Sequence, residues 1–250
     1  DFKRIEIEPV SGNLGAILHG VDLGNLDDET FGEIHHAWMD NGVVFFRDQE
    51  ITPEQQIAFA KRLGEIHYHP YMHGLDDHPE VLEIAKEPGD GYTFGAVWHT
   101  DQMFNPQPAM ATMLYAKEVP SRGGDTMFSN QYSAYEALSD GMKELLCGLN
   151  ALHSSRTLTD TTSRSDRNDS RSTKLRDDID PEADAIDNIH PVVRTHPETG
   201  RKSIFVNRPF TIALEGMTEE ESKPLLEFLF EHCARPEFTC RFRWEEGSVA

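Results

Sequence analysis

The sequence predicts a fold built mainly from β-strands, a β-sandwich or jelly roll with helices packed outside it. Beyond residue 78 the apolar segments are short and are separated by proline, glycine or polar turns, which is typical of strands. These strands do not alternate regularly with helices, so a parallel α/β sheet is the weaker alternative. With 250 residues, 38% of them hydrophobic, the chain is long enough to bury a sizeable core.

The N-terminal part predicts the order strand, strand, helix, strand, helix. Ile5 and Ile7 alternate with charged residues, as in a half-buried strand. Thr52 is followed by Pro53 and Gln55, a capping box with proline at the first helical position. We expect strands at residues 4–9, 16–23 and 43–46, and helices at residues 27–42 and from 53 through 63.

The rest of the chain predicts six short strands interrupted by two helices. One helix begins near Tyr132 and continues through Leu146. The other covers residues 218–233, with Thr218 as N-cap and Glu221 as its capping-box partner, although Pro224 favours a start nearer to itself. The strands are expected at residues 79–85, 108–116, 123–130, 190–196, 203–207 and 238–244.

One segment stands apart from this pattern. Residues 154–188 are dense in Ser, Thr, Asp and Arg and nearly free of large apolar side chains. We expect either a flexible insertion or a lid that closes over a substrate. No internal repeat is visible, so we expect a single domain over residues 1–250. The chain begins without methionine and stops at the beginning of an apparent strand, so it looks truncated, notably at the C-terminus.

Composition excludes several classes of partner. The net charge of −21 repels nucleic acid and anionic membranes. The apolar runs are too short to span a membrane, and no secretory signal is visible at the start. The three cysteines fit no zinc or redox motif, so we expect free thiols in a reducing cytoplasm.

The strongest candidate for chemistry is a histidine and an aspartate one residue apart, His99 and Asp101, in the apolar stretch 96–104. On a strand, residues i and i+2 face the same side, so the two side chains would point together. Together with a remote histidine they would form the two-histidine, one-carboxylate set that binds non-haem Fe(II). The alternative is a plain His–Asp hydrogen bond, because the pattern is short and common.

The order of several motifs narrows this choice. The segments 98–104, 123–139, 190–207 and 242–250 together resemble the taurine dioxygenase / 2,4-D dioxygenase (TauD/TfdA) family of Fe(II)- and 2-oxoglutarate-dependent oxygenases. The resemblance covers nearly the whole chain. It implies a double-stranded β-helix, or jelly roll, with flanking helices. It also implies an oxidoreductase that hydroxylates a small organic substrate with dioxygen, releases succinate and CO2, and assembles as a dimer or tetramer.

The resemblance also assigns roles to individual residues. His99 and Asp101 match the first two iron ligands and are the catalytic pair, and Thr126 matches the hydroxyl that binds a carboxylate of 2-oxoglutarate. The alternative for Thr126 is a β-branched residue that only favours a strand. The family's third ligand, a histidine, and its 2-oxoglutarate arginine follow a segment like the one that ends at Ala250. None of the late histidines stands at that position: His190, His196 and His232.

Two other functions therefore stay open. A chain that lacks the third ligand would be a jelly-roll binding protein, a pseudoenzyme. A hydrolase that holds zinc on the same residues is a further alternative.

The resemblance places the substrate pocket at His69, Tyr71, Phe104, Phe205 and Asn207. Met72 stands where sulfonate-binding members carry tyrosine, and Gly95 stands where they carry asparagine. These exchanges make the site softer and roomier, which suits a bulkier or less polar substrate. We expect a sulfonate, a sulfate ester or an aryloxy acid.

Two further features near this pocket have open interpretations. Arg208 either attracts an anionic substrate or is simply exposed. His67, His69 and His73 are better explained as solvated or substrate-facing histidines than as a second metal site.

Overall fold

The computed structural model describes residues 2–160, 168, 172–173, 175–176, 178–180 and 182–250. Its first elements are β1 (Glu6–Pro9), β2 (Ala16–His19), α1 (Asp28–Asn41), β3 (Val44–Phe45) and α2 (Pro53–Leu63). The central elements are β4 (Thr126–Ser129), α3 (Gln131–Glu136), α4 (Asp140–Leu146), β5 (Asn150–Ser154) and α5 (Arg156–Thr159). The last are β6 (Asp187–Pro191), β7 (Val193–Thr195), β8 (Lys202–Ile204), β9 (Thr211–Leu214), α7 (Glu219–Cys233), the 3-10 turn η1 (Pro236–Phe238) and β10 (Thr239–Phe242).

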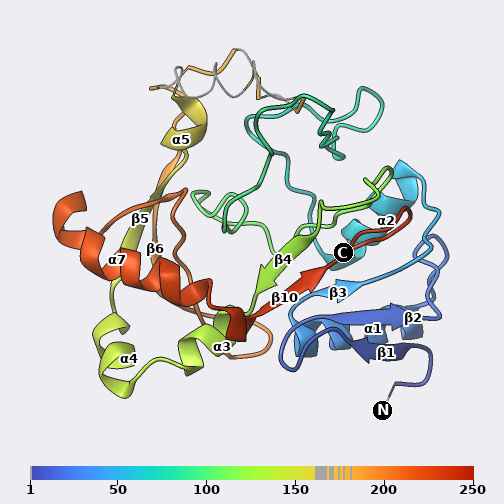
Figure 1. Cartoon of the computed structure of the whole chain (residues 1–250), viewed down its shortest axis with the longest axis horizontal. Coiled ribbons are helices and arrows are strands. Elements are labelled where there is room, and N and C mark those ends of the chain that lie inside the picture. The colour runs from blue at the N-terminus through green and yellow to red at the C-terminus, as the bar shows by residue number, and fades with distance from the viewer. Residues whose placement is uncertain (1, 161–167, 169–171, 174, 177, 181) are drawn as a thin grey trace.

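Within these described residues the strands form four small sheets. In the first sheet, β2 pairs antiparallel with β1 and parallel with β3. The other pairs are all antiparallel: β4 with β10, β5 with both β6 and β9, and β7 with β8. The β4–β10 ribbon runs through the middle of the molecule, between the first sheet and the β5 sheet with α7 (Figure 1). Sheets with flanking helices agree with the coarser part of the predicted architecture, and the jelly roll stays a prediction.

The N-terminal elements confirm the predictions closely, because local capping chemistry defines their ends. Thr52 accepts a hydrogen bond from the backbone of Gln55, whose side chain returns one to the Thr52 backbone, so α2 begins where expected. Gly42, at φ +72°, ends α1 in a conformation that glycine adopts without strain.

The long stretch between α2 and β4 departs from the predictions. Residues 79–85 and 108–116 were expected as strands, yet neither forms one, and only Tyr115 makes an isolated bridge, to Val249. The expected strand through His99 is also absent. Around residues 79–85 the backbone bonds locally instead, with Val81 bonded to Leu75 and His78. In the second segment only residues 114–116 pair, through backbone hydrogen bonds to residues 248–250. The stretch appears in cyan to green without arrows in Figure 1.

The two later helices also differ in detail from the predictions. The expected continuous helix from Tyr132 is broken into α3 and α4, because the Ser139 hydroxyl caps a new start at the backbone of Met142. Helix α7 begins at Glu219 rather than near Pro224. The reciprocal capping box of Thr218 and Glu221 fixes that start, and it offsets the one hydrogen bond that Pro224 cannot donate.

Separate groups of buried side chains hold the sheets and the loop stretch. One lies among β1–β3, α1 and α2, and another joins α3, α4 and α7 to β5 and β8. A third, which we call the Tyr71 cluster, ties the loop stretch to the chain around Phe210. Its buried members are Tyr71, Met72, Met103, Phe104, Leu175, Ile179 and Phe210. Three of the predicted substrate residues belong to this cluster or pack against it.

The described part of the 154–188 segment contributes to that cluster rather than standing away from it. Leu175 and Ile179 are buried in it, and the Thr173 hydroxyl bonds to both backbone groups of Ala85. A cavity of about 500 Å3 opens between these residues and the chain from Met72 to Ala85. Whether the segment moves as a lid stays a prediction, and residues 161–167, 169–171, 174, 177 and 181 lie outside the described residues.

Of the helices that the structure describes, none is both long and apolar enough to cross a membrane.

Candidate active site

His99 and Asp101 meet although no strand carries them. The His99 Nε2 atom lies 3.1 Å from Asp101 Oδ1, and the two side chains are 30% and 47% exposed. The chain reaches this arrangement through irregular backbone followed by a turn, in which Gln102 adopts φ +45°. The predicted proximity therefore holds, but the predicted strand geometry behind it is wrong.

Each member of the pair is also held from behind. The His99 Nδ1–H group donates to the carbonyl of Val97 at 2.7 Å, and the Thr112 hydroxyl donates to Asp101 Oδ2 at 2.6 Å. The remaining atoms, Nε2 and Oδ1, face each other. Histidine metal ligands commonly use one ring nitrogen for such a backbone bond and the other for the metal.

The surroundings favour the charged form of both residues. The hydrogen bond to Asp101 raises the pKa of His99, by more than burial lowers it. Burial opposes ionisation of Asp101, yet hydrogen bonds from His99 and Thr112 keep the pKa of its carboxyl below the usual range. A divalent metal that binds His99 Nε2 would compete with a proton at that atom.

One imidazole nitrogen and one carboxylate oxygen suit a divalent iron as two of its ligands. Among the described residues, His, Cys, Asp and Glu form no cluster of three or more that could hold a metal ion. The late histidines are engaged elsewhere: the Nε2 atoms of His190 and His232 bond to the carbonyls of Asn105 and Ala134. His196 accepts backbone N–H groups from Glu198 and Thr199. The second metal site weighed for His67, His69 and His73 is likewise not found among the described residues.

Thr126, the predicted 2-oxoglutarate ligand, is the first residue of β4. Gly123 and Gly124 precede it with φ of +78° and +75°, a left-handed turn that glycine permits. Its backbone pairs with Phe242 of β10, and its hydroxyl accepts a 2.8 Å hydrogen bond from the indole N–H of Trp244. The role of Thr126 itself stays a prediction.

The predicted substrate residues meet in and beside the Tyr71 cluster. Phe104 is fully buried, 5.2 Å from the Phe210 ring and 6.1 Å from the Tyr71 ring between centroids. Phe205 packs against the same cluster. Asn207 is buried beside it and donates from Nδ2 to the sulfur of Met103 at 2.7 Å.

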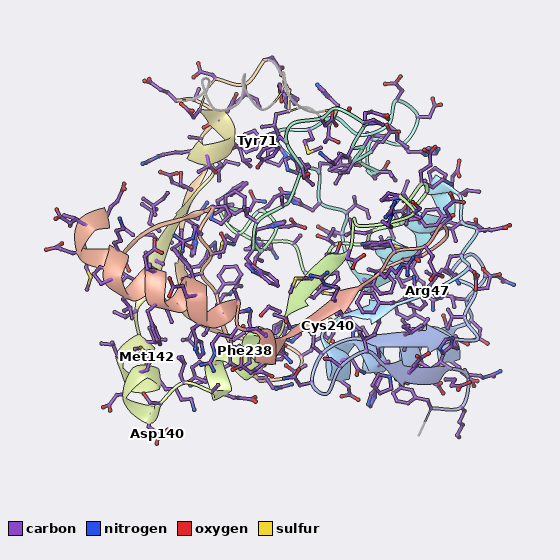
Figure 2. The ribbon with its side chains drawn as sticks, viewed as in Figure 1. Arg47, Tyr71, Asp140, Met142, Phe238 and Cys240 are labelled. Atoms are coloured by element: carbon purple, nitrogen blue, oxygen red, sulfur yellow. The ribbon has the colours of Figure 1, made fainter. Side chains whose placement is uncertain are left out.

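The Tyr71 hydroxyl already has partners in the 154–188 segment. It donates to the Asp184 carbonyl, 2.6 Å away, and lies 2.7 Å from the hydroxyl of Ser155. The backbone N–H of Arg176 donates to the Tyr71 carbonyl as well. Figure 2 shows Tyr71 beside α5, which begins this segment. The Tyr71 hydroxyl therefore ties down the segment while its ring is buried in the Tyr71 cluster, and a contact of that ring with substrate stays a prediction.

His69 is a neutral hydrogen-bond donor in this arrangement. Burial lowers its pKa to about 4, against the opposing influence of the Asp101 charge. Its Nδ1 atom accepts the backbone N–H of Tyr71 at 3.0 Å, so the proton of the neutral ring sits on Nε2. Such a group can donate to an anionic oxygen.

Arg208 offers no free charge. Its guanidinium pairs with Glu227 of α7 at 2.6 Å and lies over the ring of Phe230. The hypothesis that Arg208 attracts an anionic substrate gains no support from this geometry.

Sequence reasoning assigned no role to two residues that the structure makes prominent. One is Trp244, through its bond to Thr126. The other is His153 of β5, which is fully buried next to His190 and Phe205, with an Nε2 atom that has no hydrogen-bond partner among the described residues. A lone histidine in an apolar strand is only a weak sign of a functional residue. Nothing in a sequence indicates which partner the N–H of a tryptophan will bond to.

Several known proteins resemble this chain over nearly its whole length. A family model described as "Taurine catabolism dioxygenase TauD, TfdA family" matches residues 6–250. A putative alpha-ketoglutarate-dependent sulfonate dioxygenase of Schizosaccharomyces pombe is 34% identical over 98% of this chain and 62% of its own length. An alpha-ketoglutarate-dependent sulfate ester dioxygenase of Pseudomonas putida is 32% identical over 99% of this chain and 80% of its own length.

A solved structure supports the same relationship in three dimensions. A taurine dioxygenase from Burkholderia xenovorans superposes with a TM-score of 0.78 and 36% sequence identity. The match covers 99% of this chain and 79% of that one. The chain thus spans under two thirds of the S. pombe relative's length and more of the other two.

Proposed function

This chain belongs to the TauD, TfdA family, and from that membership we propose that it is an Fe(II)- and 2-oxoglutarate-dependent dioxygenase that hydroxylates a small organic substrate. The observation that carries the proposal is the His99–Asp101 pair, whose two facing atoms lie 3.1 Å apart. The Val97 carbonyl and the Thr112 hydroxyl hold the other atom of each side chain. This pre-organisation suits two ligands of one iron.

The chain's own residues supply position and environment. His99 and Asp101 would hold the iron, and Thr126 would donate its hydroxyl proton to a carboxylate of 2-oxoglutarate. When bound, iron and 2-oxoglutarate supply the oxidising chemistry with dioxygen and yield succinate and CO2. The buried rings of Tyr71 and Phe104 would keep water away from the reacting carbon.

The substrate class follows from the pocket residues. His69, as a neutral donor, suits the oxygens of a sulfonate, a sulfate ester or the carboxylate of an aryloxy acid. Gly95 leaves space beside His99 and Asp101, because a Cβ at this position would lie 3.5 Å from the His99 ring. Met72 adds an adaptable apolar surface. The S. pombe and P. putida relatives, named for sulfonate and sulfate ester substrates, support the first two classes.

The finer features of fold and setting belong to the same proposal. We infer a double-stranded β-helix for the assembled sheets, supported by the likeness to the B. xenovorans taurine dioxygenase. The segment 154–188 would act as a lid. Three unpaired cysteines suit a cytoplasmic location. A dimer or tetramer is expected and can be measured by light scattering.

The proposal is tested by an anaerobic titration. Fe(II) is added to the protein, followed by 2-oxoglutarate, and the visible spectrum is recorded. Chelation of iron by the keto acid gives a weak charge-transfer band, and the band should be missing in His99→Ala. Candidate sulfonates, sulfate esters and aryloxy acids are then screened by succinate release. A chain that binds iron and 2-oxoglutarate but oxidises none of the three classes would refute the substrate assignment alone.

A binding protein on the same scaffold is the second candidate. One observation favours it: among the described residues, no three His, Cys, Asp or Glu side chains are grouped so that they could hold a metal ion. Failure of the titrated protein to bind iron or show a band would support it. Stoichiometric zinc with no succinate formation would instead support a hydrolase.

A further inference from the structure

The hydrogen bond between Trp244 and Thr126 joins two strands at the predicted 2-oxoglutarate site. Thr126 begins β4 and pairs with Phe242 of β10, and Trp244 follows two residues later, just after β10 ends. The indole Nε1 atom lies 2.8 Å from the Thr126 hydroxyl oxygen. The Trp244 indole can therefore restrict the rotation of the Thr126 hydroxyl.

Aromatic packing holds the indole in this orientation. The Trp244 ring stands edge-to-face on Phe242, at 4.9 Å between centroids and 84° between planes. Phe242 is itself buried, stacked on Phe45 at 4.0 Å, and the guanidinium of Arg47 lies 4.3 Å from its ring centre. A side chain packed in this way loses little freedom when it donates its hydrogen bond.

The bond from the Trp244 indole N–H determines which way the Thr126 hydroxyl can donate its own proton. An indole N–H only donates, so the Thr126 oxygen must accept from it. The hydroxyl has one proton of its own, and among the described residues no acceptor takes that proton. A carboxylate only accepts, and a hydrogen bond to it is strengthened by its charge.

We propose that Trp244 is a positioning residue that holds the Thr126 hydroxyl as a donor toward the carboxylate of 2-oxoglutarate. The inference rests on the proposed function and adds a residue to it. Without the indole N–H, the hydroxyl would rotate freely and would form the bond to the carboxylate only part of the time. Removing one neutral hydrogen bond of this kind weakens binding about three- to tenfold.

The test is the substitution Trp244→Phe, which keeps an aromatic ring against Phe242 and removes the N–H donor together with part of the indole ring. The dissociation constant of 2-oxoglutarate is measured by calorimetry on protein loaded with Mn(II), so no turnover is needed. We expect it to rise about three- to tenfold, while Mn(II) affinity is unchanged. The matched control is Trp38→Phe, on helix α1 rather than beside the β4–β10 ribbon, which should leave the constant unchanged.

A double substitution separates positioning from packing. In Thr126→Val the hydroxyl is absent, so adding Trp244→Phe should weaken 2-oxoglutarate binding no further. Thr126→Ser, which keeps the hydroxyl, should retain sensitivity to Trp244→Phe. Two additive losses in the valine background would mean that Trp244 acts through packing, and the proposal would be overturned.

A second readout needs no variant of the tryptophan. The indole N–H resonance of Trp244 should shift when 2-oxoglutarate is added to the Mg(II)-loaded protein, and should not shift in Thr126→Val. If the unaltered chain and Trp244→Phe bind 2-oxoglutarate with equal affinity, this inference is overturned while the proposed function stands. If the unaltered chain does not bind 2-oxoglutarate, the proposed function falls and takes the inference with it.

Discussion

His99 Nε2 and Asp101 Oδ1 face each other across 3.1 Å, while the second polar atom of each side chain is bonded to a neighbour of its own. For His99 the neighbour is a backbone carbonyl two residues earlier, and for Asp101 it is a hydroxyl eleven residues later. This arrangement leaves His99 Nε2 and Asp101 Oδ1 bonded to each other, so one cation could bind both atoms in place of that bond. Several measurable consequences depend on it.

The first prediction concerns the ligand role of His99. Replacing His99 with alanine should abolish stoichiometric Fe(II) binding under anaerobic conditions, because Asp101 alone cannot hold the ion. The fold should persist, since the side chain is partly exposed. Iron content and circular dichroism check the two statements. His36→Ala, on the exposed face of α1, is the matched control, and iron retained by His99→Ala would disprove the ligand assignment.

The second prediction concerns Thr112, which acts on the metal only through Asp101. Thr112→Val removes the 2.6 Å hydrogen bond to Oδ2 and lets the carboxylate rotate. Loss of such an outer partner should weaken metal affinity roughly tenfold or more. Calorimetric titration with Mn(II) measures this, with Thr195→Val on an exposed strand position as control. Equal affinities in the two variants would mean that Asp101 needs no such support.

The third prediction concerns the attachment of the 154–188 segment. Tyr71→Phe keeps the buried ring but removes the hydroxyl that reaches Ser155 and the Asp184 carbonyl. Leaving that carbonyl unpaired should cost about 1–3 kcal/mol. We expect faster proteolysis and faster amide exchange in residues 178–186, with Tyr68→Phe, an exposed tyrosine, unchanged. Unaltered exchange in this segment would show that the hydroxyl does not secure it.

The fourth prediction concerns pH and His153. Burial lowers the pKa of His153 to about 4, helped by the positive potential of His190 and Arg194, against an ordinary value of 6.5. Between these values the unfolded chain takes up a proton that the folded chain refuses, so stability falls as pH falls. The effect of this single group reaches at most about 3 kcal/mol.

Urea unfolding at a series of pH values measures that effect. In His153→Asn, stability should depend less on pH between about 6.5 and 4 than in the unaltered chain, even if the variant is less stable overall. His36→Asn, at an exposed position, should keep the original dependence. Parallel pH curves for His153→Asn and the unaltered chain would contradict a buried neutral histidine.

The sequence predictions succeeded where a structural element depends on residues close to it in the chain, as the helix caps do. Thr52 and Thr218 carry their capping partners three residues away, so both helix starts follow from neighbouring residues. The strand predicted at 79–85 is absent because the backbone there bonds to neighbours in sequence. At 108–116 only residues 114–116 find a distant partner, residues 248–250. Strand β5 was not predicted, because His153 interrupts its apolar pattern. Its hydrogen bonds to β6 and β9 stabilise the strand despite that weak local signal.

The capped helices and the glycine turn before Thr126 could be predicted without a structure, because each depends on residues close together in the chain. The order of the motifs likewise needs no coordinates. Three contacts became visible only in the folded chain: the atom of His99 that faces Asp101, the bond of the Tyr71 hydroxyl, and the bond from Trp244 to Thr126. Trp244 and Thr126 are 118 residues apart in sequence. Hydrogen bonds act over about 3 Å and depend on direction, so contacts of this kind exist only once the sheets have brought distant segments together.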